Sequence, residues 1–233
     1  MELYAIRYGT ASFPLKLVYR DMAGSKGFVK TDWLFYLACN NDKVLLIDTG
    51  FRNPLTAMFW RLRFTSAQQE LNLLLAGRQV DTVIITHSHF DHINNLGLYP
   101  HAQIVIAQEA LAQAHRRCPA AVRRVLRKGN VTTVEQEMLL EDTFLFKVIG
   151  GHDKGSSVLY FSAGEKDFVL ASDECCVCAN AWENRPIGSV YNREKNAAFL
   201  LDAHKRKLIP LPCHDTAILE NYPKQSANIA RVI

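Results

Sequence analysis

Long hydrophobic runs are absent from this sequence, and none reaches the roughly 18 residues that a membrane-spanning helix requires. The first residues, Met1 to Tyr4, carry neither the basic nor the apolar segment with which a secretory signal peptide begins. We therefore expect a cytoplasmic protein with no membrane partner.

A strong excess of one charge sign is also absent. The formal net charge is +4 over 233 residues, which is too small to indicate a nucleic-acid partner or an anionic membrane. With 48% hydrophobic and 21% charged residues, the composition is that of an ordinary globular protein, and residues 1–233 are expected to form a single domain. The six cysteines, without an export signal, are better explained as reduced thiols than as a disulfide framework.

Histidine is scarce, and it is unevenly distributed. Three of the 8 histidines lie within the segment HSHFDH at residues 87–92. The preceding residues 83–86 form a short run of β-branched side chains, which is typical of a buried strand. Imidazole nitrogen and carboxylate oxygen suit zinc, iron or manganese better than calcium or magnesium. The segment therefore indicates a metal site at a strand end, and the alternative is a polar loop of solvated histidines.

Two neighbouring ions explain the spacing of these ligands. His87 and His89 can project to the same side of an extended chain, whereas the adjacent residues Asp91 and His92 can share a direction only if the chain turns. We expect the His87/His89 pair to hold one ion and the Asp91/His92 pair to hold the other.

Three more candidate ligands follow predicted strands. His152 follows residues 144–149, Asp173 follows residues 168–171, and His214 follows residues 208–213. Seven ligands result: His87, His89 and His152 for one ion, Asp91, His92 and His214 for the other, and Asp173 as a bridge between both. The other histidines, His101, His115 and His204, follow no strand end and are expected in the surface or the core.

Asp48 is a candidate partner of this site. It ends a predicted β-hairpin made by residues 33–39 and 44–47. A buried aspartate needs hydrogen-bond partners, and it could orient a metal-bound histidine through the free ring N–H. The alternative is a turn cap.

The remaining pattern predicts strands that alternate with helices. An edge strand is expected at residues 3–8, followed by an irregular loop at 9–31 whose aromatic residues either line a substrate cleft or anchor the loop to the core. Helical spacing of Leu55, Met58, Phe59 and Leu62 predicts a helix over residues 54–64, and Ser66 is the expected N-cap of the next helix. Further helices are expected from residues 108 and 119 and over 192–207.

The most basic segment, residues 116–128, is expected to be a solvated helix surface. A nucleic-acid face would need aromatic residues among the basic ones to stack on bases, and this segment has none.

Taken together, the pattern H-x-H-x-D-H, the later His152, Asp173 and His214, and the upstream Asp48-Thr49-Gly50 resemble the metallo-β-lactamase-fold hydrolases. The resemblance extends over nearly the whole chain. It implies an α/β fold, a four-layer αββα sandwich of two mixed sheets flanked by helices, with the metals at one edge of the sheets. The long segment before Trp33 and the terminal Cys213-His214-Asp215 are most similar to the N-acyl homoserine lactonase branch.

Two positions depart from that branch. The lactonases carry a tyrosine three residues after the bridging aspartate, where its hydroxyl helps to polarise the substrate carbonyl, and this chain has Cys176 there. A thiol is a weak hydrogen-bond donor. The second departure is in the family motif P-G-H-x-x-G, where this chain has Gly150 in place of the proline.

The expected activity is the hydrolysis of a lactone or ester in a small-molecule substrate by a hydroxide that bridges two divalent ions, with zinc favoured over iron or manganese. Asp91 and Asp173 are the candidate proton relays. One alternative is a thioesterase resembling glyoxalase II, whose additional helical domain does not fit the 19 residues after His214. The other is a phosphodiesterase or nuclease on the same metals. A homodimer is left open.

Overall fold

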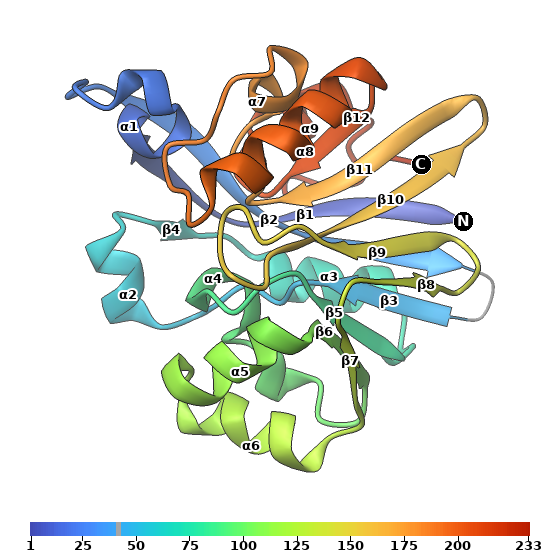
Figure 1. The fold of residues 1–233 in the computed structure, drawn as a ribbon. Helices are drawn as coiled ribbons and strands as arrows, with labels where there is room; N and C mark the ends of the chain where they lie inside the picture. Colours follow the sequence, from blue (N-terminus) through green and yellow to red (C-terminus); the bar gives the residue numbers. More distant parts are fainter. Residues whose placement is uncertain (41–42) are drawn as a thin grey trace.

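The computed structural model describes residues 1–40 and 43–233, and the strands of this part form two sheets (Figure 1). The first has the order β13-β1-β2-β3-β5-β6-β7, with β4 paired to β1, and the second has the order β12-β11-β10-β9-β8. The strands are β1 (Glu2–Pro14), β2 (Phe28–Asn40), β3 (Lys43–Ile47), β4 (Arg63–Phe64), β5 (Thr82–Ile85), β6 (Gln103–Ala107), β7 (Val131–Val134), β8 (Glu137–Leu140), β9 (Phe144–Val148), β10 (Ser157–Ala163), β11 (Lys166–Ser172), β12 (Ile209–Pro212) and β13 (Ile229–Arg231).

Both sheets are mixed. In the first, β3, β5, β6 and β7 are parallel neighbours, and β13, β1, β2 and β3 are antiparallel neighbours. In the second, β11 and β12 pair in parallel, and the other pairs are antiparallel. Parallel neighbours end at the same edge of a sheet, so each sheet gathers strand ends on one side.

Helices cover the outer faces of both sheets (Figure 1). Helices α7 (Cys178–Trp182) and α8 (Arg193–Lys205) lie over the second sheet, and α5 (Gln108–Arg117) and α6 (Ala120–Lys128) lie beyond the first. The expected four-layer αββα sandwich is therefore confirmed. The other helices of the described residues are α1 (Leu15–Val18), η1 (Arg20–Met22), α2 (Pro54–Phe59), α3 (Ala67–Leu75), α4 (Phe90–Ile93), η2 (Leu96–Leu98) and α9 (Ala217–Asn221).

Alternation along the strands creates two apolar layers. On β10 and β11, Leu159 and Leu170 join the large core shared with the first sheet. Their neighbours Val158 and Val169 point the other way and pack with Phe199 of α8. Successive strand residues face opposite sides, so one sheet supplies both layers.

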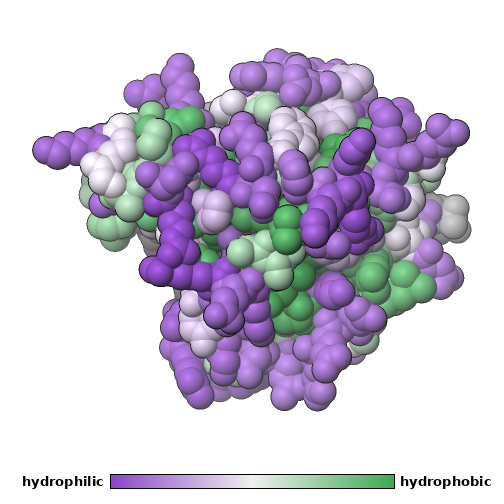
Figure 2. Space-filling view, turned by 45° about the horizontal axis from the view of Figure 1, so that its top comes forward, coloured by the Kyte–Doolittle hydropathy of each residue, from purple (hydrophilic) through white to green (hydrophobic). Residues whose placement is uncertain are grey.

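Most of the surface in Figure 2 is hydrophilic, and hydrophobic residues show in patches near its middle. Among the helices of the described residues, none combines the length and the apolar composition that a bilayer crossing requires.

The prediction of an irregular loop over residues 9–31 is wrong for 9–14 and 28–31, which are strand, and the residues between them include the short helices α1 and η1. Strand β1 continues to Pro14 and pairs there with Phe28, the first residue of β2. Gly9, which suggested a break, sits where the register shifts, and a Cβ there would lie 2.8 Å from the Leu62 side chain. The glycine thus marks a bulge with a close approach inside a strand, which the sequence alone does not distinguish from a loop.

The predicted helix over residues 54–64 is also too long. Helix α2 begins at an Asn53 cap and ends at Phe59, and Arg61 has a positive φ of 52° that turns the chain into β4. Its expected apolar stripe does not face the core, because Leu55, Met58 and Phe59 are 73%, 73% and 80% exposed. Periodicity shows that residues share a face, but it does not show what covers that face.

Other expectations have mixed outcomes. The β2–β3 hairpin is confirmed, although its predicted turn at residues 41–42 lies outside the described residues. Ser66 stands at the N-cap position of α3, but its hydroxyl hydrogen-bonds to the Glu70 carboxylate and makes no cap bond to the backbone. The sequence pattern does not predict strands β4, β7, β8 and β13.

We expect Gly155→Ala to destabilise the protein, because a Cβ at Gly155 would lie 2.3 Å from the backbone nitrogen of Ala110 at the start of α5. Backbone cannot move aside as a side-chain tip can, so the cost should be about 1–3 kcal/mol of unfolding free energy. Urea unfolding measures it. Gly97→Ala is the control, since no atom lies within 4 Å of its added Cβ; equal stability of both variants would contradict the prediction.

Candidate metal centre

The seven predicted ligands lie at the edge where strand ends of both sheets meet. His87 follows β5, Asp173 follows β11 and His214 follows β12, while His152 lies in the loop from β9 to β10. β11 and β12 are parallel neighbours, which places Asp173 and His214 at the same edge.

Helix α4 supplies the turn that Asp91 and His92 need. His89 stands at its N-cap and the other two residues lie within it. The carbonyl of His92 accepts hydrogen bonds from the amide and the hydroxyl of Thr49, at 2.7 and 2.9 Å, and the carbonyl of Asp91 accepts one from the Tyr8 hydroxyl at 3.0 Å. The helix is therefore fixed from the first sheet.

The first group consists of His87, His89, His152 and one oxygen of Asp173. Nδ1 of His89 lies 2.9 Å from Nε2 of His87 and 3.1 Å from Nε2 of His152. Oδ2 of Asp173 lies 3.8 Å from Nε2 of His87 and 3.3 Å from Nε2 of His152.

The second group consists of Asp91, His92, His214 and the other oxygen of Asp173. Oδ1 of Asp173 lies 3.5 Å from Nε2 of His92 and 3.3 Å from Nε2 of His214. Oδ2 of Asp91 lies 3.6 Å from each of these two nitrogens. Asp173 thus turns one carboxylate oxygen to each group.

These groups have the geometry of ligands around cations. Four ligands about 2.0–2.1 Å from a tetrahedral ion lie about 3.4 Å apart, which is close to the observed separations. Nε2 of His92 and Oδ1 of Asp173 are buried without a hydrogen-bond partner among the described residues. A buried polar atom without a partner is costly, and an ion would satisfy both. The residues therefore fit a metal pair.

Partners outside the two groups orient the rings. Nδ1 of His92 donates to Oδ2 of Asp48 at 2.7 Å, as expected for Asp48, and Nδ1 of His152 donates to the carbonyl of Ser189 at 2.8 Å. Asp48, at a φ of 63°, also accepts from the amide of Thr86 at 2.9 Å. Each bond leaves Nε2 of its histidine directed into the site.

Burial and neighbouring charges shift the pKa values of these histidines in opposite directions. Burial lowers the pKa of His87 well below its usual value, and His92 and His89 lower it further. Burial also acts against the proton on His214, but Asp173 and Asp91 outweigh it and raise the pKa of His214 to about 9. The pKa of His92 is raised well above its usual range because Asp173 and Asp48 outweigh burial. The carboxylates thus favour cations in the second group.

A cavity of about 260 Å³ lies over the two groups and is mainly apolar. His89, Asp91, His152, Asp173 and His214 lie at its base; the other lining residues are Phe13, Leu17, Trp33, Trp60, Phe90, Cys176, Ile187 and Ser189. Cys176 therefore lines the cavity, but burial and Asp173 raise the pKa of its thiol well above the usual value. A reactive thiolate at Cys176 is disfavoured by these groups.

Sequence reasoning missed most of the cavity wall. Trp33 was assigned only to a strand, and Leu17 and Ile187 to no site. These residues come together only through the packing of α1, β2 and the segment after α7. The aromatic residues of the segment 9–31 have separate roles: Phe13 lines the cavity, the Tyr19 ring packs against Arg185, and Phe28 is exposed.

The sequence matches the family described as the Metallo-beta-lactamase superfamily over residues 34–218. The chain belongs to the metallo-β-lactamase superfamily. The matched range contains all seven residues of the two groups, so the site lies within the part of the chain that matches this superfamily. A search of curated proteins returned no significant match.

Solved structures of N-acyl homoserine lactonases share this metallo-β-lactamase fold. A quorum-quenching N-acyl homoserine lactone lactonase has a TM-score of 0.77 at 20% identity, with 94% of each chain covered. An N-acyl homoserine lactone hydrolase with N-hexanoyl-L-homoserine at its catalytic metal centre has a TM-score of 0.77 at 18% identity, covering 94% of this chain and 95% of the other. The dizinc quorum-quenching lactonase AidC has a TM-score of 0.68 at 14% identity, covering 99% and 93%. The resemblance in fold that the motifs indicated is thus confirmed.

Metal uptake by the second group should release protons. His214 has a pKa of about 9, so it is protonated at pH 7, and its Nε2 must lose that proton before it can bind an ion. Apparent zinc affinity should therefore rise with pH up to about 9. Zinc calorimetry on chelator-treated protein, in buffers of different ionisation heat, measures the proton count, which we expect to be about two with His92 included. Identical heats in all buffers at pH 7 would show that no proton is displaced.

Proposed function

We propose that this protein is a dinuclear metal-dependent hydrolase that cleaves a lactone or ester in an apolar small molecule. The ligands would be His87, His89 and His152 for one ion, Asp91, His92 and His214 for the other, and Asp173 for both. The observation that carries the proposal is the Asp173 carboxylate, which turns one oxygen to each group at the base of an apolar cavity.

Zinc suits this donor set best, because five imidazole nitrogens outnumber the carboxylates, although iron and manganese also bind such sites. When bound, the two ions would lower the pKa of a water shared between them and polarise the substrate carbonyl. The similar fold of AidC, a dizinc lactonase, supports zinc here.

The chain's own carboxylates would handle the protons. Asp91 and Asp173 both line the cavity, and the histidines around them lower the pKa of each. Either can accept a proton from the attacking water and pass it to the leaving oxygen. Tyrosine, which assists the carbonyl in the lactonases, is replaced by Cys176, so the ions would carry more of that task.

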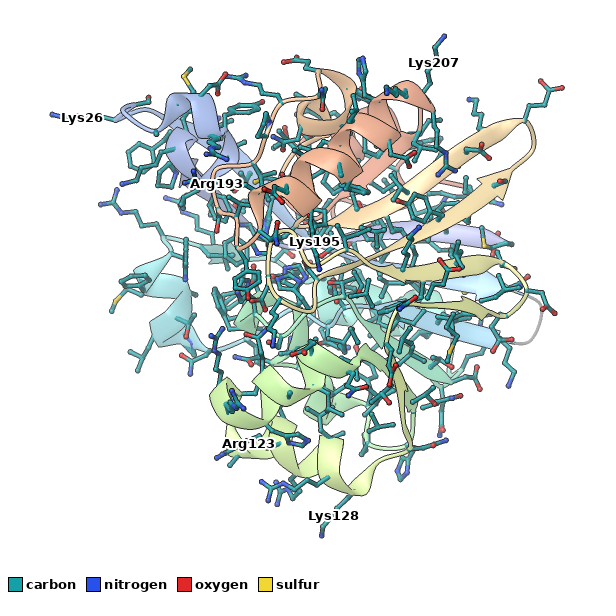
Figure 3. All side chains as sticks on the ribbon, viewed as in Figure 1. Lys26, Arg123, Lys128, Arg193, Lys195 and Lys207 are labelled. Atoms are coloured by element: carbon teal, nitrogen blue, oxygen red, sulfur yellow. The ribbon has the colours of Figure 1, made fainter. Side chains whose placement is uncertain are left out.

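The cavity favours a neutral acyl group over a phosphate. Its wall is made of Phe13, Trp33, Trp60, Phe90 and other apolar residues, and no lysine or arginine is among the described residues that line it. The basic residues of the α5–α6 region lie elsewhere: Figure 3 shows Arg123 and Lys128 at the lower edge of the molecule. A phosphodiesterase or nuclease would use cations near the metals to hold its substrate.

An N-acyl lactone is the substrate class that fits best. An acyl chain would occupy the apolar wall while the ring carbonyl meets the ions, and the related structures bear the names of N-acyl homoserine lactone hydrolases. A thioester of similar shape is the second candidate, because the same cavity accepts its acyl chain. A panel of lactones, esters, thioesters and phosphodiesters separates these classes.

Asp173→Asn should abolish hydrolysis and leave the protein folded. An amide is neutral and offers one oxygen, so both ions would be bound more weakly, and turnover should fall by several powers of ten. Excess zinc should rescue it poorly. His214→Ala is the comparison, and its loss should be smaller because only one ion is directly affected. Near-normal activity of Asp173→Asn, with its metal content verified, would refute the dinuclear mechanism.

Trp60→Ala should lower kcat/KM for long-chain substrates by about 10- to 100-fold, which corresponds to the loss of about 1.5–3 kcal/mol of apolar burial. Short-chain substrates should lose much less. Leu55→Ala removes an apolar side chain from the same segment, but Leu55 is exposed and does not line the cavity. Both variants are measured by kcat/KM on substrates of increasing acyl length. A uniform loss across the series would show that Trp60 does not contact the acyl chain.

A further inference from the structure

Glu174, the residue after Asp173, is a buried acid with no part in the proposed chemistry. Its exposed fraction is 0%. Oε1 accepts hydrogen bonds from the amides of Gly151 and His152, at 2.8 and 2.9 Å, and from the Ser156 hydroxyl at 2.5 Å. Oε2 accepts one from Nδ2 of Asn196 in α8 at 2.9 Å. Four donors therefore converge on this carboxylate, and three of them belong to the loop that carries His152.

This arrangement fixes His152 at its backbone. The ring is already held through Nδ1 by the carbonyl of Ser189 at 2.8 Å, while Nε2 faces Oδ2 of Asp173 at 3.3 Å. Without the bond to Glu174, the His152 amide would remain buried without an acceptor, and the loop would have to move to satisfy it. Backbone and ring restraints together determine where Nε2 lies.

The two glycines before His152 allow Glu174 to approach the loop. A Cβ on Gly151 would lie 2.4 Å from Oε2 of Glu174, so only glycine allows the approach. Gly150 has a φ of 72°, and its amide donates to the carbonyl of Ser156 at 2.9 Å. Proline, the lactonase residue at this position, has φ near −65° and no N–H, so it cannot adopt this conformation. The loop thus departs from the family motif at the residue directly before those that Glu174 holds.

Helix α8 completes the enclosure. Asn196 also donates to the backbone carbonyl of Glu174 at 3.0 Å. Figure 3 shows Lys195, its neighbour at the start of α8, directed toward the loop between β9 and β10. A Cβ on Gly150 would lie 3.4 Å from Nζ of Lys195. The loop is therefore held between the end of β11 and α8.

We propose that Glu174 is a positioning residue for His152, acting through the loop at residues 150–156 to set the geometry of the first metal group. The proposal rests on the proposed function, because it takes His152 as a metal ligand. It differs from a general role in stability, because it predicts that only the ion held with His152 responds. The second group is built on α4 and β12, and among the described residues no hydrogen bond or ion pair joins its Asp91, His92 or His214 to this loop.

Glu174→Gln tests the proposal with little change of volume. The amide keeps one oxygen, but its NH₂ would face Nδ2 of Asn196, which is also a donor, so the network cannot be satisfied as before. Zinc affinity is measured by competition with a chromophoric chelator in two backgrounds. His214→Ala weakens the second ion and reports on the first; His152→Ala weakens the first and reports on the second.

We expect Glu174→Gln to lower first-site affinity by about 10- to 100-fold in the His214→Ala background and to leave second-site affinity unchanged in the His152→Ala background. Equal losses in both backgrounds, or none in either, would overturn the proposal. If the protein with native residues holds fewer than two ions, the proposed function fails instead, so the two failures are distinct.

Two further variants secure the interpretation. Asp32→Asn removes another buried carboxylate, one paired with Arg7 at 3.4 Å, and should leave both zinc affinities unchanged. Ser156→Ala removes one donor to Glu174 without altering its charge and serves if Glu174→Gln does not fold. It should give a smaller loss, again confined to the first site, and a loss at the second site would count against the proposal.

Discussion

The sharing of one carboxylate between two clusters of imidazoles is the constraint on which the site depends. Asp173 lies at the end of β11, and its oxygens face His152 on one side and His214 on the other. Five histidine rings and two aspartates in a largely buried space would be unfavourable as unpaired polar groups. Cations bound between them would offset this cost, which would tie the stability of the region to its proposed chemistry.

The two sheets make the sharing possible. β5 delivers His87, and α4 then turns the chain so that Asp91 and His92 face the second cluster. β11 and β12 deliver Asp173 and His214 from the other sheet. Residues one shell further out, Asp48 and Glu174, each hold one side of the centre, Asp48 through a ring nitrogen and Glu174 through a backbone amide. The apolar cavity lies over this centre.

Much of this could be predicted from the sequence, because strand ends and ligand chemistry are both local signals. The segment at 87–92 and the later His152, Asp173 and His214 each follow an apolar run, and the fold brings those runs to one edge. That these residues bind metal remains a prediction. The sheet order, the bulge at Gly9 and the exposed face of α2 depend on distant contacts, so no local pattern reveals them. Glu174 has no signal of its own: a single acid beside a ligand looks like any other until its four donors are placed around it.

The account is tested most directly by anomalous diffraction at the zinc edge on crystals of the zinc-loaded protein. It predicts two peaks about 3.5–4 Å apart, with Asp173 between them, His87, His89 and His152 around one, and Asp91, His92 and His214 around the other. A single peak, or two peaks of which only one contacts Asp173, would contradict it.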